Sequence, residues 1–160
     1  MSQYFNNKVV AITGGSDGIG KALISLLLPL GAKIATCARN EEKLNLMADA
    51  FHSENLLCIK ADVSDKNDCS NFINAAIQKF GGIDILINNA GISMRSLFAD
   101  ADVEVIKKLM DINFLGAVYT TKSALKSILE RKGTIVGISS IAGYRGLPGR
   151  CGYSASKFAL

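Results

Sequence analysis

The sequence lacks the charge pattern of a nucleic-acid-binding or lipid-surface protein. Its 160 residues include 18 Lys and Arg and 14 Asp and Glu, a formal net charge of +4, and no run of five or more like charges occurs. Proteins that bind nucleic acid or anionic lipid concentrate basic residues in a patch or stripe. We therefore expect no nucleic-acid partner.

Cysteine and histidine are too sparse for a metal site or a disulfide framework. No pair of cysteines has the C-x-x-C spacing, and His52 is the only histidine in the sequence. This pattern predicts no metal and reduced thiols, which is typical of a cytoplasmic protein. The four cysteines are Cys37, Cys58, Cys69 and Cys151.

The sequence also lacks a long apolar segment. The longest apolar stretch, residues 23–35, is interrupted by Ser25, Pro29, Gly31 and Lys33, and residues 1–8 are polar. A membrane-spanning helix needs about 20 predominantly apolar residues, and a signal peptide needs an apolar core. We predict no membrane span and no secretion signal in this portion of the chain.

What the sequence does contain is a regular alternation of short apolar strands and helical patterns. Its length and 49% apolar composition are those of one globular domain. Strands are predicted at residues 9–12, 33–37, 56–60, 83–87 and 134–138, and helices at 21–30, after Asn40, at 66–80 and at 103–130. Such alternation predicts an α/β fold: a Rossmann-type, doubly wound parallel sheet with helices on both faces.

A glycine-rich turn follows the first predicted strand. Residues 13–20 read TGGSDGIG, with Gly14, Gly18 and Gly20 spaced differently from the dinucleotide pattern G-x-G-x-x-G. Glycines let the backbone bend tightly and approach a pyrophosphate, whose charge then lies at the N-terminus of the helix beginning near Gly20. A merely structural strand-to-helix turn is the alternative interpretation.

Three motifs together resemble the short-chain dehydrogenase/reductase family. They are the glycine turn, the sequence NNAG at residues 88–91 directly after the fourth predicted strand, and Tyr153 with Lys157. The resemblance runs from Lys8 to the last residue. It implies that residues 1–160 form a single NAD(P)-binding Rossmann domain.

The end of the second predicted strand indicates which nicotinamide cofactor is used. In the family, NAD-using members carry an acid at the position of Ala38, where it bonds the ribose 2′-hydroxyl; here Arg39 follows, and a guanidinium can bind the 2′-phosphate of NADP. We predict NADP(H), an ordinary surface arginine being the alternative. The resemblance places Asp62 and Val63 against the adenine. The predicted cofactor-binding residues are Gly14, Ser16, Asp17, Gly18, Ile19, Gly20, Arg39, Asp62, Val63, Asn89, Ala90, Gly91, Tyr153 and Lys157.

The Tyr153 and Lys157 pair has the spacing of neighbours on one helix face. An unperturbed tyrosine has a pKa of about 10, and a nearby ammonium lowers it toward the range useful for general acid–base catalysis. The resemblance implies that Ser140 hydrogen-bonds the substrate oxygen and that Asn113 holds a water of a proton relay. Ser139 is the rival to Ser140, because a register error of one residue would exchange them. The predicted catalytic residues are Asn113, Ser140, Tyr153 and Lys157.

The sequence stops within an apolar helical pattern, three residues after Lys157. Members of the family continue through two further strands and a substrate-closing loop, so we expect the domain to be truncated at the C-terminus and to continue beyond residue 160. The resemblance also implies a homodimer or homotetramer of the full-length protein.

These observations predict an NADP-dependent oxidoreductase that transfers a hydride between NADP(H) and a small-molecule carbonyl or alcohol substrate, with Tyr153 as general acid and base. Residues 88–96 are similar to the branch that contains dehydrogenase/reductase member seven, which implies a lipid-like substrate. Two alternatives remain open: a non-catalytic NADP(H)-binding sensor, and an inactive truncated fragment.

Overall fold

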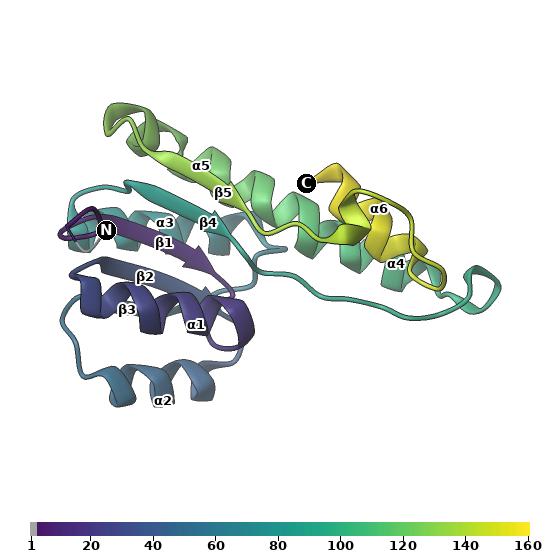
Figure 1. Cartoon of the computed structure of the whole chain (residues 1–160), viewed down its shortest axis with the longest axis horizontal. Helices are drawn as coiled ribbons and strands as arrows, with labels where there is room; N and C mark the ends of the chain where they lie inside the picture. Colours follow the sequence, from purple (N-terminus) through teal and green to yellow (C-terminus); the bar gives the residue numbers. More distant parts are fainter. Residues whose placement is uncertain (1–2) are drawn as a thin grey trace.

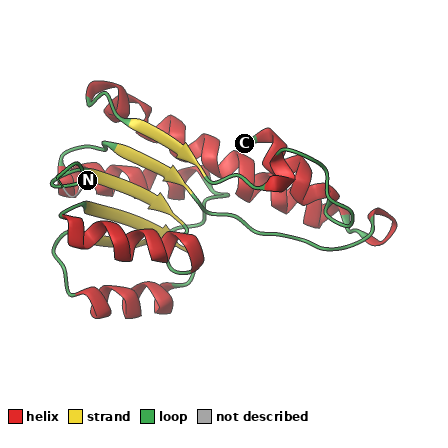
Figure 2. Ribbon diagram, in the orientation of Figure 1, coloured by secondary structure: helices red, strands yellow, loops and turns green. Residues whose placement is uncertain are grey.

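The computed structural model describes residues 3–160, which contain one five-stranded parallel sheet in the order β3-β2-β1-β4-β5. The strands are β1 (Val9–Thr13), β2 (Lys33–Ala38), β3 (Leu56–Lys60), β4 (Ile85–Asn88) and β5 (Thr134–Gly137). All of them point the same way in Figure 2. The predicted doubly wound parallel sheet is therefore confirmed, and its strand order reverses between β1 and β4.

Helices cover both faces of this sheet (Figure 1). They are α1 (Gly18–Leu27), α2 (Glu41–Phe51), α3 (Lys66–Phe80), α4 (Val103–Met110), α5 (Gly116–Glu130) and α6 (Cys151–Ala159). One buried cluster joins the sheet to α1 and α2, and a second joins it to α3 and α5. Because β1 has a helical layer on each side, all five of its residues are buried, which explains its continuous apolar sequence.

Alternate strand residues enter opposite clusters. Ala11 and Leu86 face the α3 and α5 side, whereas Val10 and Ile87 face α1 and α2. Phe72 of α3 is completely buried in the first cluster, and a buried aromatic or aliphatic side chain of this size contributes roughly 1.5–3 kcal/mol. This two-sided core fixes the strand ends that carry the glycine turn and the NNAG segment.

Local capping residues set several element boundaries. Asn40 caps α2 as predicted, its Oδ1 accepting a hydrogen bond from the Lys43 backbone N–H at 2.9 Å. Helix α1 begins at Gly18 with Asp17 as its N-cap, earlier than expected, and ends at Leu27 because Pro29 converts the next turn to a short 3₁₀ helix, η1 (Leu28–Leu30).

Strand β4 begins two residues later than predicted. Asp84 lies before the strand, and its carboxylate accepts a hydrogen bond from the Val9 backbone N–H at 2.8 Å and another from the Arg131 guanidinium at 3.2 Å. These bonds tie the starts of β1 and β4 to the end of α5. The Asp84 backbone also bonds both neighbouring strands, its N–H donating to the Val9 carbonyl and its carbonyl accepting from the Thr134 N–H, both at 2.9 Å.

The predicted helical stretch over residues 103–130 is confirmed, but it is not α-helical throughout. A π-helical segment, η3 (Asp111–Leu115), separates α4 from α5. Helices α4 and α6 lie past the carboxyl ends of the strands (Figure 1). This π-helical segment is important for the site because it contains Asn113.

Strand β5 forms one edge of the sheet and is exposed over most of its length. Two short 3₁₀ helices, η2 (Phe98–Asp100) and η4 (Ile141–Gly143), occur in the loops that follow β4 and β5. Among the helices of residues 3–160, none is long and apolar enough to cross a membrane.

Candidate active site

A cavity of about 650 Å³ opens at the carboxyl ends of the strands, where the strand order reverses. In open α/β sheets this reversal is the place where ligands bind. Loops from β1, β2, β3, β4 and β5 and helix α6 all contribute to its wall. The lining residues are Gly14, Ser16, Asp17, Gly18, Ile19, Cys37, Ala38, Arg39, Asn40, Lys43, Ala61, Asp62, Val63, Asn89, Ala90, Gly91, Ile92, Ser93, Ile112, Ile138, Ser139, Tyr153 and Lys157.

The glycine turn packs directly on the NNAG segment. Gly14 has φ +72°, and a Cβ placed on it would lie 2.9 Å from the Ala90 Cα. The Asn89 amide Nδ2 donates to the Thr13 and Gly14 carbonyl oxygens at 2.9 and 3.1 Å. Any side chain at Gly14 would both strain the backbone and separate the two segments.

Thr13 strengthens the same junction. Its hydroxyl oxygen accepts hydrogen bonds from the backbone N–H groups of Asn89 and Ala90, both at 3.0 Å. These bonds join residues 76 and 77 positions apart in the sequence. Two motifs that sequence analysis treated separately are therefore one structural unit.

Gly20 does not line the cavity, although it was predicted to bind the cofactor. It is buried beneath the turn, where a Cβ would clash with the Gly14 carbonyl oxygen. Its role in the structure is to let α1 pack under the turn. Gly18 and Ile19 at the start of α1 line the cavity, and the positive end of a helix dipole suits a pyrophosphate.

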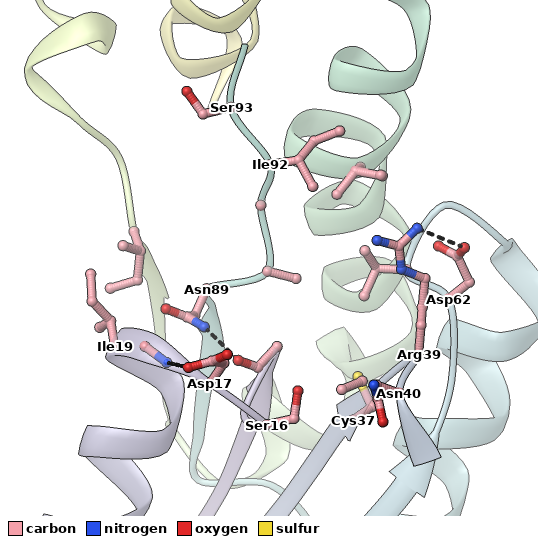
Figure 3. A pocket seen from close by; sticks show the side chains of 18 of the residues that line it. Ser16, Asp17, Ile19, Cys37, Arg39, Asn40, Asp62, Asn89, Ile92 and Ser93 are labelled. Carbon is pink, nitrogen blue, oxygen red and sulfur yellow. Dashed lines mark hydrogen bonds and ion pairs between the residues drawn. The ribbon is translucent and has the colours of Figure 1, made fainter. Parts of the chain in front are cut away.

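The outer end of the cavity, next to β2 and β3, is charged. Arg39 and Asp62 form a long ion pair, with 3.9 Å between the guanidinium NH1 and carboxylate Oδ2 atoms (Figure 3). Partial burial raises the pKa of the Asp62 carboxyl, but two hydrogen bonds from Ser64 and the Arg39 charge outweigh that effect and hold this pKa below its usual value. The Arg39 side chain is 53% exposed, so a ligand can reach it.

The inner end of the cavity carries Tyr153 and Lys157 on α6. The Lys157 ammonium is buried, and its Nζ donates to the Ile138 carbonyl oxygen at 2.8 Å. Burial lowers the pKa of Lys157 from its usual 10.5. The tyrosine is half-buried, with the Arg150 guanidinium 5.9 Å from its ring centroid.

The two candidate serines are placed differently. Ser139 lines the cavity, and its hydroxyl donates to the Lys157 carbonyl oxygen at 3.3 Å. Ser140 is the N-cap of η4, where its Oγ accepts the Ala142 backbone N–H at 3.2 Å, and it is not part of the cavity wall. The assignment of Ser140 to the substrate oxygen thus remains a prediction, with Ser139 as its rival.

Asn113 lies behind the cavity wall rather than in it. The residue is 1% exposed. Its Oδ1 accepts the Ile92 N–H at 2.8 Å, and its Nδ2 donates to the Ile92 carbonyl at 2.9 Å and to the Ser156 hydroxyl at 2.8 Å. A Cβ on Gly91 would lie 3.2 Å from Asn113 Oδ1 and 3.5 Å from Lys157 Nζ. Asn113 therefore fixes the loop after β4 against the helix that carries the Tyr and Lys.

The cavity includes residues that sequence reasoning missed, among them Asn40, Lys43, Ile92, Ser93 and Ile138. Ile92 and Ser93 directly follow the NNAG segment, and this position in the sequence could have predicted that they line the cavity. Lys43 lies four residues after Arg39, in the first turn of α2, but no local pattern shows that this helix places it beside the glycine turn.

A family model described as short chain dehydrogenase matches residues 8–160. The chain belongs to the short-chain dehydrogenase family. It is 43% identical over 159 residues to a 3-ketodihydrosphingosine reductase of Bos taurus, covering 94% of this chain and 48% of the relative. It is 41% identical over 164 residues to 11-beta-hydroxysteroid dehydrogenase A of Arachis hypogaea, covering 100% of this chain and 47% of the relative.

A solved structure of the same family has a similar fold. The short-chain dehydrogenase/reductase described as a glucose/ribitol dehydrogenase from Brucella melitensis superimposes with a TM-score of 0.94 at 33% identity, covering 99% of this chain and 67% of that one. The chain described here spans about half the length of the curated relatives it matches. Its family fold implies a nicotinamide cofactor.

Proposed function

We propose that this chain binds NADP(H) and provides the acid–base group for the reversible reduction of a carbonyl to an alcohol. One observation carries the proposal: a single cavity has the glycine turn and Arg39 at one end and Tyr153 with Lys157 at the other. A dinucleotide cofactor is long enough to extend from one end of this cavity to the other. Phosphate-binding and proton-donating groups in one cavity favour hydride transfer over simple nucleotide storage.

The residues present fit such a cofactor. The first turn of α1 and the bare backbone at Gly14 and Gly18 can hold the pyrophosphate, while Asp62 and Val63 line the outer end expected for the adenine. Arg39 provides a planar guanidinium for the 2′-phosphate. When bound, the nicotinamide supplies the hydride or accepts it.

The protein's own contribution is the proton. In the reducing direction, the Tyr153 hydroxyl gives its proton to the carbonyl oxygen while the carbonyl carbon receives the hydride, so that the C=O double bond becomes an alcohol C–H and O–H. In the oxidising direction, the phenolate takes the proton back. Lys157, whose Nζ donates to the Ile138 carbonyl, lines the same cavity as Tyr153 and supplies the positive charge of the proposed pair. Ser140 or Ser139 hydrogen-bonds the same substrate oxygen.

The names of the relatives support a lipid-like carbonyl substrate, since one relative is a ketosphingoid reductase and another a hydroxysteroid dehydrogenase. The proposal also includes a cytoplasmic location and, for the full-length protein, a homodimer or homotetramer. Light scattering tests the assembly, and a monomer would exclude that part of the proposal.

Fluorescence titrations with NADPH and NADH test the cofactor, and NADPH oxidation at its absorbance band, measured against a panel of apolar ketones, tests the reaction. Tighter binding of NADPH together with ketone-dependent oxidation supports the proposal. Tighter binding of NADH would overturn the assignment to Arg39. Binding of NADPH without turnover of any ketone by either this chain or the full-length protein would favour a non-catalytic sensor, whereas turnover by the full-length protein alone would identify this chain as an inactive fragment.

A further inference from the structure

Arg150 immediately precedes α6, but its side chain is not used by that helix. It is the N-cap residue, and its side chain makes no capping hydrogen bond. The guanidinium NH1 instead donates to the Ser93 hydroxyl at 2.6 Å, across 57 positions of sequence. Ser93 lines the cavity on the loop after β4, and Figure 3 shows it at the opposite end from Cys37 and Asn40. The Arg150 side chain therefore joins the start of α6 to the cavity wall.

Backbone hydrogen bonds hold the same junction. The Ser96 N–H donates to the Gly149 carbonyl at 2.9 Å, so the residue before Arg150 is also bound to the loop after β4. Gly149 has φ +66°, a conformation that glycine adopts without strain. The Arg150 carbonyl accepts the Ser154 N–H at 2.7 Å. Arg150 is thus fixed through both its main chain and its side chain.

The anchored guanidinium lies against the ring of Tyr153. Its carbon Cζ is 5.9 Å from the ring centroid, a distance at which a cation is attracted to an aromatic face. In the part of the chain that the structure describes, no carboxylate pairs with Arg150, whereas Arg39 and Arg131 each form an ion pair with an aspartate. The charge of Arg150 therefore acts on the ring without an anion to neutralise it.

We propose that Arg150 is a positioning residue for Tyr153: held by Ser93, its guanidinium fixes the phenol ring at the inner end of the cavity. This inference rests on the proposed acid–base role of Tyr153. A phenol that exchanges a proton with one substrate oxygen reacts fastest when its ring is held in a single orientation. Arg150 acts through Tyr153 and does not itself contact the substrate.

Kinetics of variants of the full-length protein, with apolar ketones as substrates, test the proposal. Arg150→Met removes the charge and the hydrogen bond, Arg150→Lys keeps a cation, and Ser93→Ala removes the anchor. Arg145→Met is the matched control, because it removes the same charge from an exposed side chain of the same segment. The thermal midpoint of each variant shows whether it is folded.

Arg150→Met should lower kcat by about three- to ten-fold and leave KM and the Kd for NADPH within about two-fold, as expected when one contact between a cation and an aromatic ring is lost. Arg150→Lys should keep kcat within about two-fold, and Ser93→Ala should lower it less than Arg150→Met does. The double variant should be no slower than Arg150→Met alone, because the anchor then has no guanidinium to hold. Arg145→Met should change none of these constants.

Fluorine NMR of protein labelled with fluorotyrosine provides a measurement that needs no turnover. The Tyr153 signal is identified by its absence from the spectrum of Tyr153→Phe. It should shift in Arg150→Met and in Ser93→Ala, because the surroundings of the ring change when the guanidinium is removed or released. It should keep its position in Arg145→Met.

A Tyr153 signal that does not move in Arg150→Met would overturn the proposal, whether or not the protein is active. A rise in KM with unchanged kcat would show that Arg150 binds the substrate, and equal losses in Arg150→Lys and Arg150→Met would show that the residue only supports the fold. If the losses of the two single variants multiply in the double variant, Ser93 acts independently of Arg150.

Failure of the proposed function gives a different result. The unmodified protein would then reduce no ketone, while a Tyr153 signal that moves in Arg150→Met and Ser93→Ala would still support the placement of the ring by Arg150.

Discussion

Replacing Asn113 by alanine should destabilise the chain and loosen the inner end of the cavity. The substitution removes two hydrogen bonds to the Ile92 backbone and one to the Ser156 hydroxyl from a residue that is 1% exposed. A buried polar group left without its hydrogen-bond partner lowers the free energy of unfolding by about 1–3 kcal/mol. Water that binds the backbone of the half-buried Ile92 will offset part of this loss. We therefore expect a loss of about 2–4 kcal/mol in the free energy of unfolding.

For a chain of this length, about 1 kcal/mol changes the midpoint by about 2–4 °C, so the variant should melt about 4–16 °C lower. Thermal unfolding followed by circular dichroism measures the midpoint, and an NADPH titration shows whether the loop after β4 still supports binding. Asn74→Ala is the matched control, because the exposed Asn74 makes one long hydrogen bond of 3.4 Å to Ser70. If the midpoint of Asn113→Ala falls by no more than that of Asn74→Ala, the assignment of Asn113 as the residue that fixes this loop is refuted.

Four further predictions concern the site. Tyr153→Phe should reduce kcat by about 10²–10⁴-fold while the NADPH Kd stays within about two-fold, measured by NADPH oxidation and by titration. Of Ser139→Ala and Ser140→Ala, the variant with the larger loss of kcat identifies the serine on the substrate oxygen; equal small losses would exclude both. Gly14→Ala should weaken NADPH binding at least about ten-fold in titrations, because its φ is +72° and its Cβ would lie 2.9 Å from the next loop. Burial raises the pKa of the Cys37 thiol to about 12, so at pH 8 it should react with iodoacetamide far more slowly than a free thiol, and fast labelling in the folded chain would contradict its burial.

Local sequence was sufficient for most of the fold. The apolar runs at β1, β2 and β3, the Asn40 cap and the left-handed Gly81 at the end of α3 all follow from residues within a few positions of one another. Backbone preference, side-chain capping and apolar periodicity act over this short range. The same is true of the glycine turn, whose shape depends on its own residues.

Other features could not be read locally. The π-helical segment in the predicted helix over residues 103–130 has no composition that distinguishes it from an α-helix, and it exists where Asn113 bonds the Ile92 backbone, 21 residues away. The same limit applies to Asp84, whose carboxylate accepts a hydrogen bond from the Val9 backbone N–H across 75 positions.

The sequence by itself thus determined the class of fold, the glycine turn and the motifs of a family. Only the tertiary structure decided that Thr13 and Asn89 join two of those motifs, that Lys43 reaches Asp17, and that Ser139 and not Ser140 lines the cavity. The physical reason is distance along the chain. Strand and helix preferences come from neighbouring residues, whereas each of these contacts depends on which strands lie side by side and how the helices pack on them.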